Sequence, residues 1–162
     1  MKPRLLFVLL LTATSLLAHH KTADYYDVTR PLTLKGVVKE FVRANPHSFI
    51  LLDVKSPAGS VATWAVEGDG PNNLIAAGWD LKASGWNKNM AMPTETVSVT
   101  AYPAKPGVNL ASTLVIDEAN MGPALLTTMK RVAEIQKAGH LVHGADVTLA
   151  DGRKLLFGEA GR

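Results

Sequence analysis

The feature that most constrains this chain is a succession of short segments in which apolar and polar residues alternate, separated by turns rich in Pro, Gly and Asn. Alternation with a period of two is typical of half-buried β-strands. It predicts strands over residues 31–44, 49–54, 61–67, 95–102, 110–117, 145–149 and 154–157. Such strands favour a mainly β fold, a small curled antiparallel barrel or sandwich, because closure removes exposed sheet edges.

The first predicted strand should curl. Gly36 permits a bulge or bend, and Val38 and Phe41 do not keep strict alternation. The third predicted strand alternates cleanly, with Val61, Thr63 and Ala65 on one face and the residues between them on the other. We therefore expect a bent first strand and a regular third one.

Two segments have helical signals. Residues 71–78 begin with Pro71, which suits a first helical position, and end at Gly78, which can adopt a left-handed cap. Residues 122–139 change period to three and four, with apolar positions at Leu125, Met129, Val132 and Ile135. The longer helix should cover the sheet with its apolar side; binding a partner is the alternative. We expect it to be an insertion before the last hairpin.

Residues 1–18 are typical of a secretory signal peptide. Lys2 and Arg4 precede the apolar run Leu5–Leu11, and Ala18 precedes the expected cleavage. The apolar run is too short for a retained transmembrane helix. We therefore expect a periplasmic or secreted protein that is not inserted in the membrane after cleavage.

The remaining 144 residues suffice for one domain. We expect an N-terminal arm over residues 19–30, in extended form, with Tyr25 and Tyr26 pinning it to a single barrel-like domain over residues 31–162. The mature chain has 15 basic and 14 acidic side chains, a net charge of +1, so no nucleic-acid partner is expected. The absence of cysteine excludes disulfides and thiolate metal sites.

The mature N-terminus is a candidate metal site. Cleavage after Ala18 makes His19 the first residue, whose α-amine and imidazole can chelate one Cu(II) ion. His47, at a predicted turn, is the best-placed third ligand, with His20 as a substitute. The alternative is that none of them binds a metal: His19 and His20 are then exposed residues after a cleavage site, and His47 is a turn residue.

Other polar candidates are weaker. His140 and His143 are three residues apart at the end of the longer predicted helix, a spacing that could place both on one face, but Gly139 should end the helix first. Glu67 and Asp69 follow the third strand and could do acid–base work if a pocket separated their pKa values. Solvated carboxylates at a strand end are the simpler interpretation.

Two tryptophans are candidate ligand-binding residues. Trp79 and Trp86 flank a glycine-containing segment and could line an apolar groove or stack on a sugar or peptide. Packing in the core is the alternative for both. Trp64 lies within a strand and is expected to be buried.

Short motifs along the mature chain carry a resemblance. They are His19-His20, Leu32-Thr33-Leu34-Lys35-Gly36, Asn45-Pro46-His47, Trp64-x-Val66-Glu67, Pro71-Asn72-x-Leu74, Gly78-Trp79, Val97-x-Val99-Thr100-x-Tyr102-x-Ala104-Lys105 and Leu149-Ala150-Asp151-Gly152-Arg153-Lys154-Leu155. Together they resemble the small exported bacterial proteins grouped as domain of unknown function 6152. The resemblance implies an exported, mostly β domain, similar in shape to oligonucleotide/oligosaccharide-binding-type barrels. It implies no activity and no site residues.

The sequence departs from that family pattern at two places, residues 86–93 and the helix over 122–139. We find none of the common motifs for a nucleophile elbow, a phosphate-binding loop or a zinc protease. The sequence therefore favours an exported, non-enzymatic binding or accessory module, whose partner is an unknown small ligand or a periplasmic protein. The alternative is a copper-binding protein in metal delivery or redox, and a metal-free hydrolase using Glu67 or Asp69 is a third class.

Overall fold

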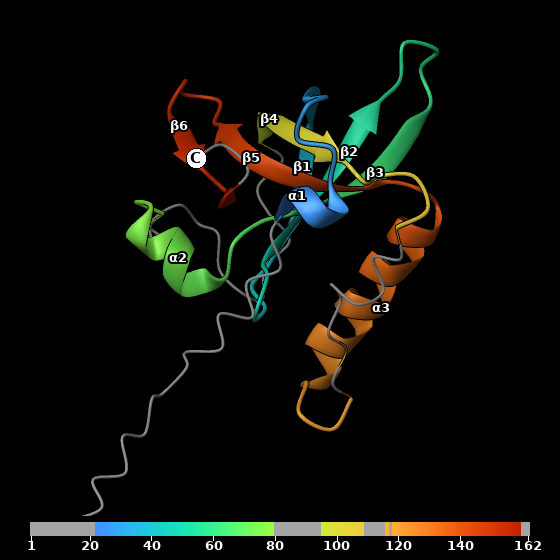
Figure 1. Cartoon of the computed structure of the whole chain (residues 1–162), viewed down its shortest axis with the longest axis vertical. Helices are drawn as coiled ribbons and strands as arrows, with labels where there is room; N and C mark the ends of the chain where they lie inside the picture. The colour runs from blue at the N-terminus through green and yellow to red at the C-terminus, as the bar shows by residue number, and fades with distance from the viewer. Residues whose placement is uncertain (1–21, 80–94, 109–115, 117, 160–162) are drawn as a thin grey trace, which may run out of the picture.

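The computed structural model describes residues 22–79, 95–108, 116 and 118–159 (Figure 1). The helices are α1 (Thr22–Tyr25), α2 (Pro71–Ala76) and α3 (Pro123–Lys137). The strands are β1 (Leu32–Val42), β2 (Phe49–Lys55), β3 (Val61–Glu67), β4 (Thr96–Pro103), β5 (Leu141–Thr148) and β6 (Lys154–Leu156).

The strands form one sheet that closes on itself. The order is β3-β2-β1-β4-β5-β6, and β3 also pairs with β5 in parallel, through Ala65–Leu141, Val66–Val142 and Glu67–His143. This closure makes a barrel of β1 to β5, with β6 paired to the far end of β5. The predicted mainly β barrel is confirmed, and its strand order is that of the oligonucleotide/oligosaccharide-binding type.

β1 occupies the centre of the sheet because it is long enough to pair with two neighbours. Its first half pairs with β4 and its second half with β2. The expected change of phase is present, but the register shift lies between Val38 and Glu40 rather than at Gly36. Gly36 instead allows the backbone of β2 to approach closely. A Cβ at Gly36 would be 2.4 Å from the backbone oxygen of Asp53, so only glycine permits this approach.

The alternating side chains of the barrel form two cores. The inner one contains Ile50, Leu52 and Val66, and Trp79 after α2 belongs to it. The outer one contains Phe49, Leu51, Ala65 and Leu141 from β2, β3 and β5. In an isolated barrel these apolar residues of the outer face would be exposed to solvent, so other elements must pack over them.

α3 and the N-terminal arm provide that cover. α3 contacts β3 and β5, and its Met129 and Val132 are buried in the outer core. In the view of Figure 1, α3 lies at the lower right of the barrel and α2 at the left. The amphipathic helix therefore packs on the sheet as expected, and Gly139 after it has the left-handed φ of +79°.

Several predicted boundaries differ from the structure. The arm is not wholly extended, because Thr22–Tyr25 forms the short helix α1. β5 begins at Leu141, four residues before the predicted start, where Leu141 and Val142 pair with β3. The predicted strand over 110–117 lies outside the described residues except for Ile116, which is not in a strand. Among the described residues, no helix is long and apolar enough to cross a membrane.

Candidate functional site

A buried carboxylate lies at the end of β3. Glu67 is 1% exposed. It is on the outer side of the barrel, because Val66 before it points into the inner core and Ala65 into the outer one. An ionised carboxylate in such a place is costly unless donors satisfy it. The partners of Glu67 therefore decide what this part of the molecule can do.

Each oxygen of the Glu67 carboxylate contacts its own partner. Nδ1 of His47 forms an ion pair with Oε1, and the hydroxyl of Tyr26 donates to Oε2. These partners come from separate parts of the chain, the loop between β1 and β2 and the N-terminal arm. Glu67 thus joins three segments in one polar cluster, which we call the Glu67 cluster: Tyr26, His47, Glu67 and His143.

His47 is the accessible member of the cluster. Its side chain is 36% exposed, whereas that of Glu67 is 2% exposed. Partial burial by itself would lower the pKa of His47, but the hydrogen bond to Glu67 and the charges of Glu67 and Asp69 outweigh it and raise this pKa above the ordinary value. Because Nδ1 is paired with Glu67, Nε2 is the ring nitrogen left for a ligand.

His143 is the buried imidazole of the cluster. It pairs with Glu67 across the β3–β5 closure and is 6% exposed. Its ring lies 5.3 Å from that of Tyr26, and its Nε2 has no hydrogen-bond partner among the described residues. Burial lowers the pKa of His143 to about 4, so the ring is neutral at pH 7. Two histidines beside one carboxylate therefore have opposite pKa shifts.

The cluster has the chemistry of a histidine oriented for metal binding. Metal-binding imidazoles usually donate their second ring nitrogen to a carboxylate, which fixes the tautomer and raises the basicity of the ligand nitrogen. His47 and Glu67 have this relationship. In the described part of the chain, no group of three or more His, Asp or Glu side chains could hold a metal ion. A metal at His47 would therefore need further ligands from other residues.

The structure locates some of the predicted site residues and not others. His47 and Glu67 lie together, which the sequence analysis did not expect. His140 and His143 do not share a helix face: His140 follows α3 and lies 4.7 Å, ring to ring, from Trp64, whereas His143 is in β5. His19, His20 and Trp86 lie outside the described residues.

Trp79 is part of the barrel core. It is 3% exposed, its ring packs against Phe41 and Phe157, and its Nε1 donates to the carbonyl of Leu156. This environment accounts for Trp79 by packing, the alternative weighed in the sequence analysis. A ligand-binding role for Trp79 stays a prediction.

Sequence reasoning missed the cluster as a unit. Tyr26 was expected to pin the arm, without its partner Glu67, and His143 was considered only with His140. The burial of Glu67 could have been predicted from the alternation of side chains between the two faces of the third strand. Glu67 shares the face of the apolar Ala65, and a carboxylate continuing an apolar face is a candidate for burial.

The fold and the cluster define a class, a small closed β-barrel with a buried carboxylate that orients an accessible histidine. Comparison with known families then identifies the chain: it belongs to the family of unknown function DUF6152, which it matches over residues 8–112. Tyr26, His47 and Glu67 lie within the matched range; α3 and His143 lie beyond it. No curated protein and no solved structure matches the chain.

Proposed function

We propose that this protein is an exported binding module, without a catalytic step of its own, that works in the periplasm or outside the cell. Residues 1–18 support export through their signal-peptide pattern. The strand order supports a binding role only by analogy, since barrels of this type often bind ligands. The mature net charge of +1 favours a small ligand or another exported protein over nucleic acid.

A second and sharper candidate is copper binding at His47. The single observation that favours it is the ion pair between Nδ1 of His47 and the buried Glu67 carboxylate. This pairing presents Nε2 as a basic, oriented ligand nitrogen on a side chain that is 36% exposed. Copper(II) suits imidazole and amine nitrogens, and the chain has no thiolate to offer.

The arm can supply the missing ligands. Tyr26 and His47 contact the same carboxylate, so the root of the arm is adjacent to His47. After cleavage behind Ala18, His19 is seven residues before Tyr26. The four residues of α1 advance by about 1.5 Å each, and only residues outside the helix can span about 3.5 Å each, so the reach of His19 is that of a partly helical arm. Together with Nε2 of His47, the α-amine and imidazole of His19 would complete a three-nitrogen site, with His20 as a substitute ligand. Such a site would serve metal delivery or redox.

The experiment is a Cu(II) titration of protein beginning at His19, with intact mass confirming the terminus. Two variants accompany it, one with an extra N-terminal alanine and one with His47→Ala. Tight binding of about one equivalent that both changes weaken would establish the shared site. Weak binding that is equal in all three proteins would discard copper and leave a binding module with another ligand. Loss with the added alanine alone would restrict the site to the arm.

A further inference from the structure

Tyr26 is held in place by more than its hydroxyl. It forms a backbone bridge with Ala104 after β4, the amide of Asp27 donates to the carbonyl of Pro103, and the amide of Lys105 donates to the carbonyl of Tyr25. These bonds dock the arm on the end of β4 independently of Glu67.

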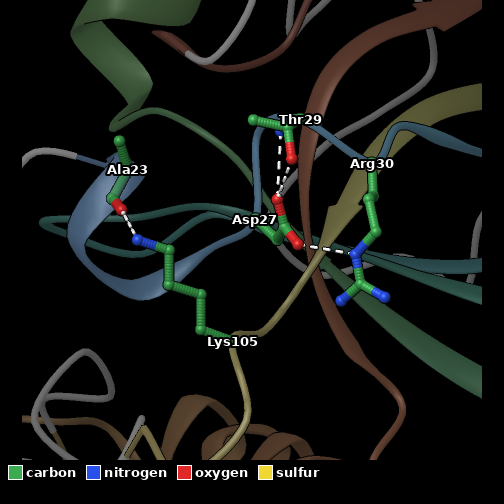
Figure 2. A network of polar contacts seen from close by, with 5 residues as sticks. All are labelled: Ala23, Asp27, Thr29, Arg30 and Lys105. Atoms are coloured by element: carbon green, nitrogen blue, oxygen red, sulfur yellow. Dashed lines mark hydrogen bonds and ion pairs between the residues drawn. The ribbon is translucent and has the colours of Figure 1, made fainter.

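Side chains extend this docking. The Lys105 ammonium donates to the carbonyl of Ala23 at 2.5 Å, as Figure 2 shows. Asp27 accepts from the backbone and hydroxyl of Thr29 and from Arg30, so the turn after Tyr26 has its own bonds (Figure 2). The backbone of Tyr26 is therefore a fixed point from which its side chain reaches Glu67.

The hydroxyl of Tyr26 and the ring of His47 contact different oxygens of the Glu67 carboxylate. Glu67 is a flexible side chain at the end of a strand, and its two oxygens are equivalent until donors distinguish them. Because Tyr26 occupies Oε2, Oε1 is directed to Nδ1 of His47. The ring of Tyr26, 2% exposed, also packs on the ring of His143.

We infer that Tyr26 is a positioning residue for His47, acting through Glu67: its hydroxyl fixes the carboxylate, the carboxylate fixes the proton on Nδ1, and Nε2 is thereby kept as a lone pair for the ligand. The inference rests on the proposed copper site. The arm then has two separate roles: Tyr26 orients His47, and the first residues of the arm would bind the metal.

The test compares Tyr26→Phe with wild type, with Tyr102→Phe as a matched control that removes a hydroxyl from β4. Outer partners of metal ligands contribute about 10- to 100-fold in metal affinity. We expect Cu(II) to bind Tyr26→Phe at least about tenfold more weakly, and Tyr102→Phe to bind as wild type does. A purely structural Tyr26 would lower thermal stability and leave the affinity of the folded protein unchanged.

A metal-free readout separates this inference from the copper proposal. The nitrogen chemical shifts of the His47 imidazole, taken at alkaline pH, report which ring nitrogen carries the proton. We expect protonated Nδ1 in wild type and a mixture of tautomers in Tyr26→Phe. Identical shifts in the two proteins would overturn the inference. If His47→Ala binds Cu(II) like wild type, the proposal of copper at His47 fails, and the shifts alone decide the positioning role of Tyr26.

Discussion

Gly158 lies so close to the imidazole of His143 that a Cβ at Gly158 would be 2.5 Å from Nε2. The same Cβ would be 2.5 Å from the backbone oxygen of Gly144. Real Cβ atoms do not approach so closely, and the backbone oxygen cannot turn away as a flexible side chain can. The segment after β6 therefore packs over His143 because residue 158 has no side chain.

We expect Gly158→Ala to destabilise the protein by about 1–3 kcal/mol, the usual cost of overpacking a close contact. Gly122→Ala is the control for the clash, since a Cβ at Gly122 has no heavy atom within 4 Å and its φ is −64°, so that its cost is limited to that of alanine at the N-cap of α3. Urea unfolding of the two variants measures the difference. Equal stability of both would show that the segment after β6 can move away from His143.

Acid should destabilise the fold through His143. Its pKa in the folded protein is about 4, well below the unfolded value of 6.5, so the unfolded chain binds the proton first as the pH falls. The stability that a neutral His143 provides is therefore complete above about pH 6.5 and declines towards about pH 4. A shift of this size corresponds to a loss on the order of 3 kcal/mol.

The contribution of His47 to stability depends on pH in the opposite direction. Its pKa is raised in the folded protein, so the stability from its pairing with Glu67 is present below pH 6.5 and is lost as the pH rises through the folded value. Unfolding free energies of wild type, His143→Gln and His47→Gln measured against pH separate the two contributions. We expect His143→Gln to flatten the acid side of the profile. An unchanged acid slope in that variant would assign the loss to other groups.

Neutralising the Glu67 carboxylate should reverse the direction of the pKa shift of His47. In Glu67→Gln the charge that raises its pKa is absent, so burial acts with less opposition and the pKa of His47 falls. The amide also satisfies Tyr26 and His47 less well, which costs about 1–3 kcal/mol of stability. An NMR titration of His47 measures the first effect. Glu134→Gln, which breaks only the exposed pair with Lys137, should leave both quantities unchanged.

Trp79 should behave as a core residue. Trp79→Ala removes the ring from its contacts with Phe41 and Phe157 and leaves the carbonyl of Leu156 without its donor. We expect a loss of about 3–5 kcal/mol, typical of a buried aromatic residue replaced by alanine. Thermal or urea unfolding measures it. Near-wild-type stability would instead return Trp79 to the candidates for ligand binding.

The periodicity of apolar and polar residues determined the mainly β fold class and most of the strands and helices. β3 was predicted at its observed bounds, because Val61–Glu67 alternates strictly between two turns. α3 was predicted to within two residues at either end, because its apolar spacing and Gly139 are local signals. Such features depend on neighbours in sequence, so the sequence by itself determines them.

The Glu67 cluster was decided only by the tertiary structure. Tyr26, His47, Glu67 and His143 are polar residues on four different segments, and no local pattern shows that two of them share one carboxylate. The parallel pairing of β3 with β5 brings His143 beside Glu67 across 76 residues of sequence, and the docked arm brings Tyr26. Burial lowers the pKa of His143, whereas at His47 the pairing with Glu67 and the charge of Asp69 outweigh burial and raise the pKa.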